Sequence, residues 1–199
     1  MSCQNEIMKK ILRAPHGTGF TASDFADVAE PRTVGKSLER LAAAGKIRRV
    51  MRGVYDRPRY SELLQEYEAP SPVGIAEALA RNYHWTIVPS GQIVLNQLGL
   101  STQVPAAWTF VSDGPYKSYQ MGGITLRFKH STNKNITGMS FKSAMVVRAL
   151  KELGQKYVQE NVIGKLRSHL THDEKKRLYR ESQRATAWMR PVIKKICEG

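Results

Sequence analysis

Apolar residues in the first thirty positions recur at the spacing of short amphipathic helices. Positions 7, 8, 11 and 12 would share one face of a first helix, which Asn5 can cap. Pro15 and the glycines that follow it are expected to end this helix. A second, shorter helix is predicted from about Ala22 to Val28, with its apolar side chains facing inward.

A third helix is predicted to begin at Pro31, because proline is favoured in the first turn of a helix. Val34, Leu38 and Leu41 recur at i, i+4 and i+7, so they would form its buried face. Gly45 is suited to the left-handed position that ends a helix.

Two short β-prone runs, 47–51 and 54–56, flank an Arg-Gly turn and predict a small hairpin. Two helices, a turn, a third helix and a hairpin follow one another in the order of a winged helix-turn-helix domain. We therefore predict such a domain, able to bind double-stranded DNA, over residues 1–60.

Residues 61–72 interrupt this pattern. The run Tyr-Glu-Ala-Pro-Ser-Pro at their end restricts the backbone and predicts a linker. Leu63, Leu64 and Tyr67 are interpreted as a short connecting helix.

Residues 73–199 are predicted to form a second, mixed α/β domain that ends in helices. Helical spacing covers 73–83 and about 92–98, and β-prone runs cover 84–88 and 107–112. The clearest hairpin turns at a Gly-Gly pair, and its second strand is predicted to alternate buried and solvent-exposed positions. The buried positions of this strand are Ile124, Leu126 and Phe128.

Three further helices are expected over about 140–154, 157–170 and from 171 onward. Thr171 and Glu174 fit a capping box at the start of the last one, and Pro191 is expected to kink or restart it. The whole pattern predicts an α+β fold.

The side of the third helix opposite its apolar face carries cationic and hydroxyl side chains. In helix-turn-helix proteins the N-terminal part of this helix enters the major groove, and wing cations approach phosphate or the minor groove. A winged helix that binds protein instead is the alternative, which the positive charge disfavours. The candidate DNA contacts are Arg32, Thr33, Lys36, Ser37, Arg40, Arg48, Arg49 and Arg52.

The chain is strongly basic, with 31 Lys and Arg against 17 Asp and Glu and a net charge of +14. The charge is concentrated at both ends: residues 1–60 carry +6, 61–114 carry −4 and 115–199 carry +12. A second basic surface in the last part would bind further DNA phosphates, or RNA, or nothing, and the pattern leaves these open. Its candidate residues are Lys117, Arg127, Lys129, Lys176, Arg180 and Arg184, with Lys134 and Lys142 nearby.

Several segments taken together resemble a known family. The predicted winged helix ends in RRVMRGVYDRP and is followed by PSGQIVLNQLGLSTQVP, then by FVSDGP and the Gly-Gly hairpin. This arrangement resembles the AbiEi-type antitoxins of bacterial type IV toxin–antitoxin systems. The resemblance extends to AWMRPVIKKI near the end of the chain, and LGLSTQVP is its most specific part.

The resemblance implies a DNA-binding antitoxin that represses its own operon by binding its promoter. It also implies that the C-terminal domain counteracts a nucleotidyltransferase toxin encoded alongside. Neutralisation in this family needs no stable complex, so a direct contact with the toxin is not assumed. The family carries no catalytic residues over to this chain.

A search for catalytic or metal-binding patterns leads to no expected site. A nucleotidyltransferase needs a Gly-Ser pair and paired aspartates, but only Asp24 and Asp27 are close in sequence, and a P-loop is absent. His169 and His172 lack a third ligand at a suitable spacing. We therefore expect a non-enzymatic protein without cofactor or metal; the two cysteines, Cys3 and Cys197, are too few for a disulfide framework.

Two alternatives remain at this point. One is a winged-helix transcription factor whose C-terminal domain senses a ligand, and the other is a nucleic-acid-processing enzyme. The N-terminus lacks an apolar signal core, and no apolar run approaches the length of a membrane span, so we expect a cytoplasmic protein without a membrane partner.

Overall fold

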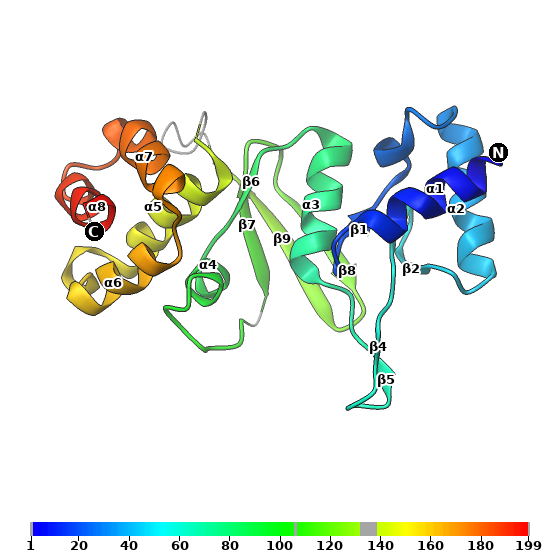
Figure 1. Ribbon diagram of the computed structural model, residues 1–199, viewed down its shortest axis with the longest axis horizontal. Coiled ribbons are helices and arrows are strands. Elements are labelled where there is room, and N and C mark those ends of the chain that lie inside the picture. The colour runs from blue at the N-terminus through cyan, green and yellow to red at the C-terminus, as the bar shows by residue number, and fades with distance from the viewer. Residues whose placement is uncertain (1, 106, 132–138, 199) are drawn as a thin grey trace. The chain divides into compact units, whose positions relative to one another are not determined.

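The computed structural model has a mixed α+β fold and describes residues 2–105, 107–131 and 139–198 (Figure 1). The chain divides into two compact units. The first comprises Met1–Trp85 and Ser118–Leu126, and the second comprises Thr86–Lys117 and Arg127–Gly199. This division does not coincide with the predicted boundaries at residues 60 and 72.

Most of the first unit comes from the N-terminal part of the chain. In chain order its elements are α1 (Cys3–Arg13), β1 (Gly19–Phe20), the 3-10 helix η1 (Ala22–Phe25), α2 (Pro31–Ala43), β2 (Arg48–Met51), β3 (Val54–Asp56), β4 (Tyr60–Ser61), β5 (Glu66–Tyr67) and α3 (Pro72–Tyr83). Ser2, not the expected Asn5, caps α1. The hydroxyl of Ser2 accepts a hydrogen bond from the backbone N–H of Asn5 at 3.3 Å. The predicted second helix is reduced to the single turn of η1.

The ends of α2 are those predicted from Pro31 and Gly45. Pro31 lies in the first turn, and Gly45 adopts a φ of 67° just beyond the last residue. The N–H of Lys46 donates to the carbonyl of Leu41 at 3.0 Å, and that of Gly45 donates to the carbonyl of Ala42 at 3.0 Å. These two bonds form a Schellman motif, which satisfies carbonyls that the helix end leaves unpaired.

Strands β1, β3 and β2 form an antiparallel sheet in that order. The predicted hairpin is confirmed: β2 and β3 are joined by Arg52 and Gly53, and Gly53 adopts a φ of 74° that favours glycine. The register is irregular between Arg49 and Met51, as in a β-bulge. The core of this unit is built from residues of α1, η1, α2 and the sheet, including Ile7, Ile11, Phe25, Val34, Leu38, Leu41 and Tyr55.

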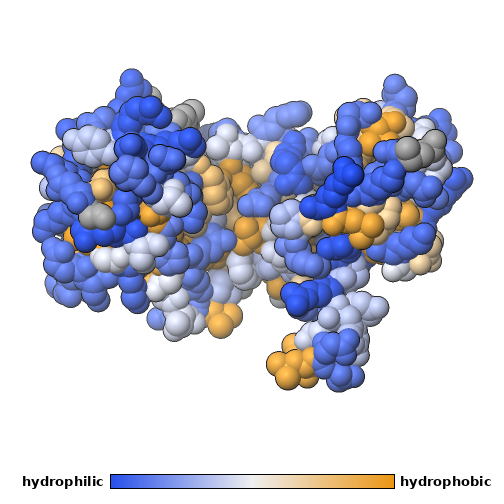
Figure 2. Space-filling model, viewed as in Figure 1, coloured by the Kyte–Doolittle hydropathy of each residue, from blue (hydrophilic) through white to orange (hydrophobic). Residues whose placement is uncertain are grey.

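Strands β4 and β5 form a separate two-stranded hairpin, so the connecting helix expected from Leu63, Leu64 and Tyr67 is wrong. Leu63 is 91% exposed and Leu64 63% exposed, and Figure 2 shows hydrophobic side chains at the end of this hairpin. Apolar residues alone predicted burial here. A helix of this length gains too little stability without a packed face, and this segment has nothing to pack against.

Helix α3 has the predicted helical conformation but belongs to the first unit. Its Gly74 lies against the backbone of Gly17 and Gly19, so closely that a Cβ at Gly74 would lie 1.7 Å from the carbonyl oxygen of Gly17. Arg81 donates from Nε to Oδ1 of Asp24 at 2.7 Å and from Nη2 to the carbonyl of Gly19 at 2.8 Å. These contacts join residues far apart in sequence. For that reason the sequence pattern ended the first domain at residue 60, before α3.

The second unit contains β6, β7, the last part of β9 and five α-helices within the described residues, because residues 118–126 of β8 and β9 group with the first unit. Its elements are β6 (Ile87–Pro89), α4 (Gln92–Gln97), β7 (Trp108–Ser112), α5 (Phe141–Leu153), the 3-10 helix η2 (Gln155–Tyr157), α6 (Glu160–Ser168), α7 (His172–Glu181), the 3-10 helix η3 (Ser182–Arg184) and α8 (Met189–Cys197). Strands β8 (Lys117–Met121) and β9 (Ile124–His130) form the predicted Gly-Gly hairpin, and the sheet order is β6-β7-β9-β8. The predicted alternation is confirmed from Leu126 to Lys129, where Leu126 and Phe128 are buried and Arg127 and Lys129 are exposed, but Ile124, predicted to be buried, is half-buried like Thr125.

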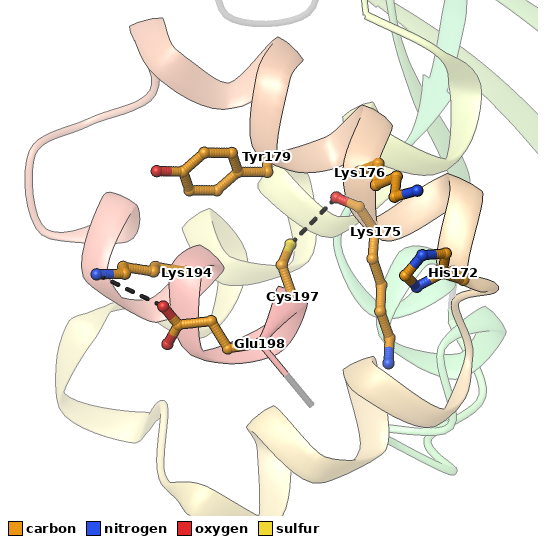
Figure 3. Close-up of a pocket in the computed structure, with 7 residues that line it drawn as sticks. All are labelled: His172, Lys175, Lys176, Tyr179, Lys194, Cys197 and Glu198. Atoms are coloured by element: carbon orange, nitrogen blue, oxygen red, sulfur yellow. Dashed lines mark hydrogen bonds and ion pairs between the residues drawn. The ribbon is translucent and has the colours of Figure 1, made fainter.

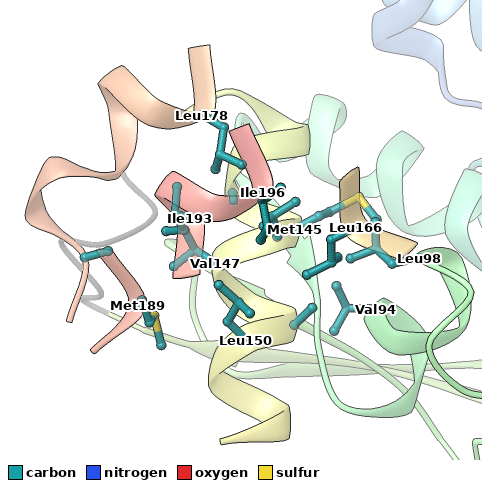
Figure 4. Packing of buried hydrophobic residues seen from close by; sticks show 14 of the residues in the cluster. Val94, Leu98, Met145, Val147, Leu150, Leu166, Leu178, Met189, Ile193 and Ile196 are labelled. Atoms are coloured by element: carbon teal, nitrogen blue, oxygen red, sulfur yellow. The ribbon is translucent and has the colours of Figure 1, made fainter. Parts of the chain in front are cut away.

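Helix α5 forms the centre of the second unit (Figure 4). Met145, Val146, Val147 and Leu150 are all buried, so nearly the whole circumference of the helix is covered, as expected of a core helix. Helices α4, α6, α7 and α8 contribute the apolar side chains around it, including Val94, Leu166, Leu178 and Ile196.

The start of α5 is tied to the end of α7. Glu181 accepts hydrogen bonds from the backbone N–H and the hydroxyl of Ser140, both at 2.9 Å. Burial raises the pKa of Glu181, but hydrogen bonds from Ser143 and Ser140 outweigh it and hold the pKa below its usual value.

The predicted capping box of α7 is confirmed. Thr171 donates its N–H to Glu174 at 2.8 Å, and its hydroxyl accepts from the N–H of Glu174 at 3.3 Å. Pro191 lies in the first turn of α8, so it restarts a helix rather than kinking one. Within the part of the chain that the structure describes, no helix has both the length and the apolar composition needed to cross a membrane.

We expect Gly74→Ala to destabilise the first unit by at least about 3 kcal/mol, because the new methyl group meets the rigid backbone of Gly17. Gly35→Ala is the matched control, since Gly35 is also helical and its Cβ would meet nothing within 4 Å. It should stabilise the chain by up to about 1 kcal/mol. Chemical denaturation followed by circular dichroism measures both, and equal midpoints for the two variants would contradict this packing.

Candidate nucleic-acid interface

The exposed side of α2 is cationic. Arg32, Thr33, Lys36 and Arg40 are all exposed, and the opposite side buries Val34, Leu38 and Leu41 in the core of the first unit. The apolar spacing that directs one side of the helix inward therefore directs these four side chains outward.

The cations of this surface make no ion pair in the part of the chain that the structure describes. Arg32, Lys36 and Arg40 make no hydrogen bond or ion pair there, and neither do Arg49 and Arg52 of the β2–β3 hairpin. An uncompensated group of cations concentrates mobile anions, which a polyanion can displace with a gain in entropy. The surface is therefore suited to a phosphate backbone.

Ser37 does not belong to this surface, although it was predicted as a contact. It is only 5% exposed, and its hydroxyl donates to the carbonyl of Thr33 at 2.9 Å and lies 3.5 Å from Sγ of Cys3. The physical reason is its place on the helix, three residues after Val34 and four before Leu41, on the buried side.

Arg48 is half-buried, and its guanidinium is engaged by partners within the unit. It faces Asp56 directly in the sheet register and donates from Nε to Oδ1 at 2.9 Å, with a second bond from Nη2 to Oδ2. Nη1 donates to the carbonyl of Glu68 at 2.9 Å. Because Asp56 is 3% exposed, this guanidinium compensates a buried charge, and its orientation is determined by that carboxylate rather than by solvent.

Arg49, next in sequence, lies on the other face of β2 and is exposed. It pairs in register with Tyr55, which is buried. Burial raises the pKa of the Tyr55 hydroxyl, Arg49 lowers it and Glu39 of α2 raises it. The Tyr55 hydroxyl thus lies near both Glu39 of α2 and Arg49 of β2, so these two parts of the candidate surface are neighbours.

One acidic side chain interrupts the candidate surface. Glu39 is exposed on α2 next to Arg40 and makes no hydrogen bond or ion pair within the described residues. Lys46, which follows the Schellman motif, is exposed as well and was not predicted as a contact.

The acidic residues weighed as metal ligands are engaged elsewhere. Asp24 caps Thr21 and pairs with Arg81, and Asp27 pairs with Lys10, which lowers the pKa of Asp27. Over residues 2–105, 107–131 and 139–198, no three His, Cys, Asp or Glu side chains are grouped as a metal site requires.

The polar side chains of the LGLSTQ segment mostly serve its own loop. Asn96 donates to the carbonyl of Gln103 at 2.6 Å, and Ser101 donates to Gln92 at 2.9 Å. The N–H of Gln103 donates to the hydroxyl of Ser101 at 3.2 Å. These side chains therefore satisfy polar groups of the loop itself.

The second predicted basic surface consists of two groups of cations on different elements of the second unit. Lys117, Arg127 and Lys129 are exposed on β8 and β9, and Lys134 lies outside the described residues. Lys176 and Arg180 are exposed on α7, one turn apart.

Lys176, Arg180 and Arg184 recur at i, i+4 and i+8 along the sequence, but they do not lie on one stripe of a single helix. Helix α7 ends at Glu181, and Arg184 follows in η3, which has a different rise and number of residues per turn. The i, i+4, i+8 spacing therefore aligns only the first two cations.

We expect Arg48→Ala and Arg49→Ala to differ in their effect on the stability of the fold. Arg48→Ala leaves the Asp56 carboxylate buried without its cation and should lower the free energy of unfolding by about 2–4 kcal/mol. Arg49→Ala removes an exposed charge and should change it by less than about 0.5 kcal/mol. Thermal and urea unfolding of the two variants test this, and equal losses would show that Arg48 does not hold the sheet.

Comparison with known proteins finds one family. Residues 6–178 match DUF6088, which is described as a family of unknown function. The matched residues run from α1 to α7 and so include most of both units. No curated protein matches the chain.

Proposed function

This chain belongs to the DUF6088 family of unknown function, and we propose that it is a DNA-binding antitoxin that represses its own operon. In this proposal the first unit is a winged helix-turn-helix that binds double-stranded promoter DNA. The second unit counteracts a nucleotidyltransferase toxin encoded alongside. The observation that carries the DNA-binding part is the uncompensated cationic side of α2 beside the β2–β3 hairpin.

The order of elements supports a winged helix. Helix α1, the single turn η1 and helix α2 precede a hairpin that pairs with the short strand β1. In the proposed arrangement α2 is the recognition helix and the β2–β3 hairpin is the wing. No disulfide, metal or cofactor is part of the proposal.

The exposed residues divide into two kinds of contact. Arg32, Thr33 and Lys36 lie in the first half of α2, which enters the major groove in helix-turn-helix proteins, so we assign them to base edges and adjacent phosphates. Arg40 lies one turn further along and is assigned to phosphate. Arg49 and Arg52 of the wing contact phosphate or the minor groove. Ser37 is removed from the contacts because its side chain is buried, and Arg48 is removed because it pairs with the buried Asp56.

The antitoxin part of the proposal rests on the resemblance to AbiEi-type antitoxins. Its support is the succession of RGVYDRP, LGLSTQVP and the Gly-Gly hairpin along one chain. The proposal does not include a stable complex with the toxin. The two activities are best separated with point variants of the full chain, because residues 118–126 group with the first unit and a cut near residue 70 would divide it.

We expect the purified chain to bind a labelled fragment of its own upstream region, with an affinity that falls steeply with salt concentration. The double variant Lys36→Ala/Arg40→Ala should bind more weakly and reduce the slope of log K against log salt by about 2, one for each lost phosphate contact. Fluorescence anisotropy over a salt series measures both quantities.

The matched control is Lys151→Ala/Lys156→Ala, which removes the same charge from exposed positions of the second unit. If the control loses as much affinity as the α2 variant, binding reflects net charge and the recognition role of α2 is wrong. An unchanged slope of log K against log salt in the Lys36→Ala/Arg40→Ala variant would also show that the recognition role of α2 is wrong.

We expect the Lys36→Ala/Arg40→Ala chain to rescue cells from the neighbouring nucleotidyltransferase although it no longer represses the promoter. Both chains are expressed from an unrelated promoter, so that lost autorepression does not alter their amounts, and growth is scored with immunoblots of each protein. Loss of rescue together with DNA binding would contradict the division of labour between the units. A neighbouring gene of a different class would contradict the antitoxin assignment itself.

A further inference from the structure

A pocket of about 300 Å³ lies between α7 and α8 in the second unit, apart from the candidate DNA surface (Figure 3). Figure 3 shows Cys197 between the residues of α7 and the Lys194–Glu198 pair of α8. The pocket is lined by His172, Lys175, Lys176, Tyr179, Lys194, Cys197 and Glu198.

The spacing of these residues explains how the two helices form a common wall. On α7 the lining residues recur at i, i+3, i+4 and i+7, and on α8 at i, i+3 and i+4, so each set occupies one side of its helix. Leu178 of α7 and Ile193 and Ile196 of α8 are buried in the core of the unit. The pocket therefore rests on a packed support and is not formed by loose side chains.

The lining carries three lysines, one histidine and a single carboxylate. Glu198 pairs with Lys194 at 3.5 Å, but both side chains are about 60% exposed, so this pair is weak and can be exchanged for a ligand anion. Lys176 makes no hydrogen bond or ion pair within the described part of the chain. The excess of cations selects an anion with more than one negative charge, such as a phosphomonoester.

The remainder of the pocket is apolar. Burial raises the pKa of the Cys197 thiol, so it stays protonated at neutral pH, and it donates to the carbonyl of Lys175 at 3.3 Å. Tyr179 is 48% exposed and offers a flat ring at the rim, beside the aliphatic stems of the lysines. An aromatic base can stack on such a ring, and the volume is at the lower end of that found for small-ligand sites.

We infer that this pocket binds a nucleoside monophosphate, with the phosphate at the lysines and the base against Tyr179 and Cys197. The chemistry is shared by a free mononucleotide and by the 5′-phosphorylated end of a single-stranded RNA. The inference does not depend on the proposed DNA-binding role, because no residue of the first unit lines the pocket.

The thiol in the pocket supplies a direct measurement. In a full-length Cys3→Ser chain, Cys197 is the only cysteine, and its rate of modification by a thiol reagent reports occupancy. AMP and UMP should slow modification and bind by calorimetry, while adenosine and inorganic phosphate should bind about ten-fold more weakly or worse, because each lacks one half of the ligand. An equal effect of phosphate alone would show an adventitious anion site and overturn the inference.

Variants locate the site. Lys176→Ala and Lys194→Ala should each weaken AMP binding by about ten-fold. Arg180→Ala, an exposed charge on α7 that does not line the pocket, should change it by less than about two-fold. Equal losses for all three would mean general charge attraction, and no loss in either lysine variant would place the ligand elsewhere; both outcomes overturn the inference.

A short 5′-phosphorylated oligoribonucleotide distinguishes the two sources. Protection of Cys197 at lower concentrations than AMP identifies an RNA end, whereas weaker protection identifies a free nucleotide. The Lys36→Ala/Arg40→Ala chain should bind AMP like the unaltered chain. Loss of AMP binding and loss of DNA binding can therefore be told apart.

Discussion

The ion pair between Arg48 and Asp56 is the interaction on which the candidate DNA surface depends. Asp56 stands opposite Arg48 on one side and Gly19 on the other, so its carboxylate lies within the three-stranded sheet. A carboxylate buried there costs several kcal/mol unless a cation compensates it. Because Arg48 fills this role, the pleat of β2 turns its neighbour Arg49 outward, beside α2.

A second long-range contact determines where the first unit ends. Residues 61–114 contain a single basic side chain, Arg81, and the structure uses it to bind Asp24 and the backbone of Gly19. Together with the close approach of Gly74, this attaches α3 to the N-terminal elements. A stretch that looks like the start of a new domain by composition is thus part of the first one.

The C-terminal excess of positive charge is distributed between different kinds of surface. Helix α7 directs Leu178 into the core, contributes Lys176 to the lining of the pocket and exposes Arg180 to solvent. The helix changes to a 3-10 turn after Glu181, so Arg184 does not continue the line of Lys176 and Arg180 along α7. Cations in a pocket with an apolar base select small ligands, whereas cations on an open surface attract any polyanion, so total charge does not distinguish the two.

The sequence by itself determined most of the longer helices, the two glycine hairpins and the capping box of α7, because hydrophobic period and the backbone preferences of Gly, Pro and Thr are local properties. It also predicted the exposed cations of α2 from the opposite apolar face. Only the tertiary structure decided that Ser37 is buried, that Arg48 pairs with the buried Asp56 and that residues 60–67 form an exposed hairpin. These outcomes depend on which distant groups meet, and a local pattern carries no information about a partner many residues away.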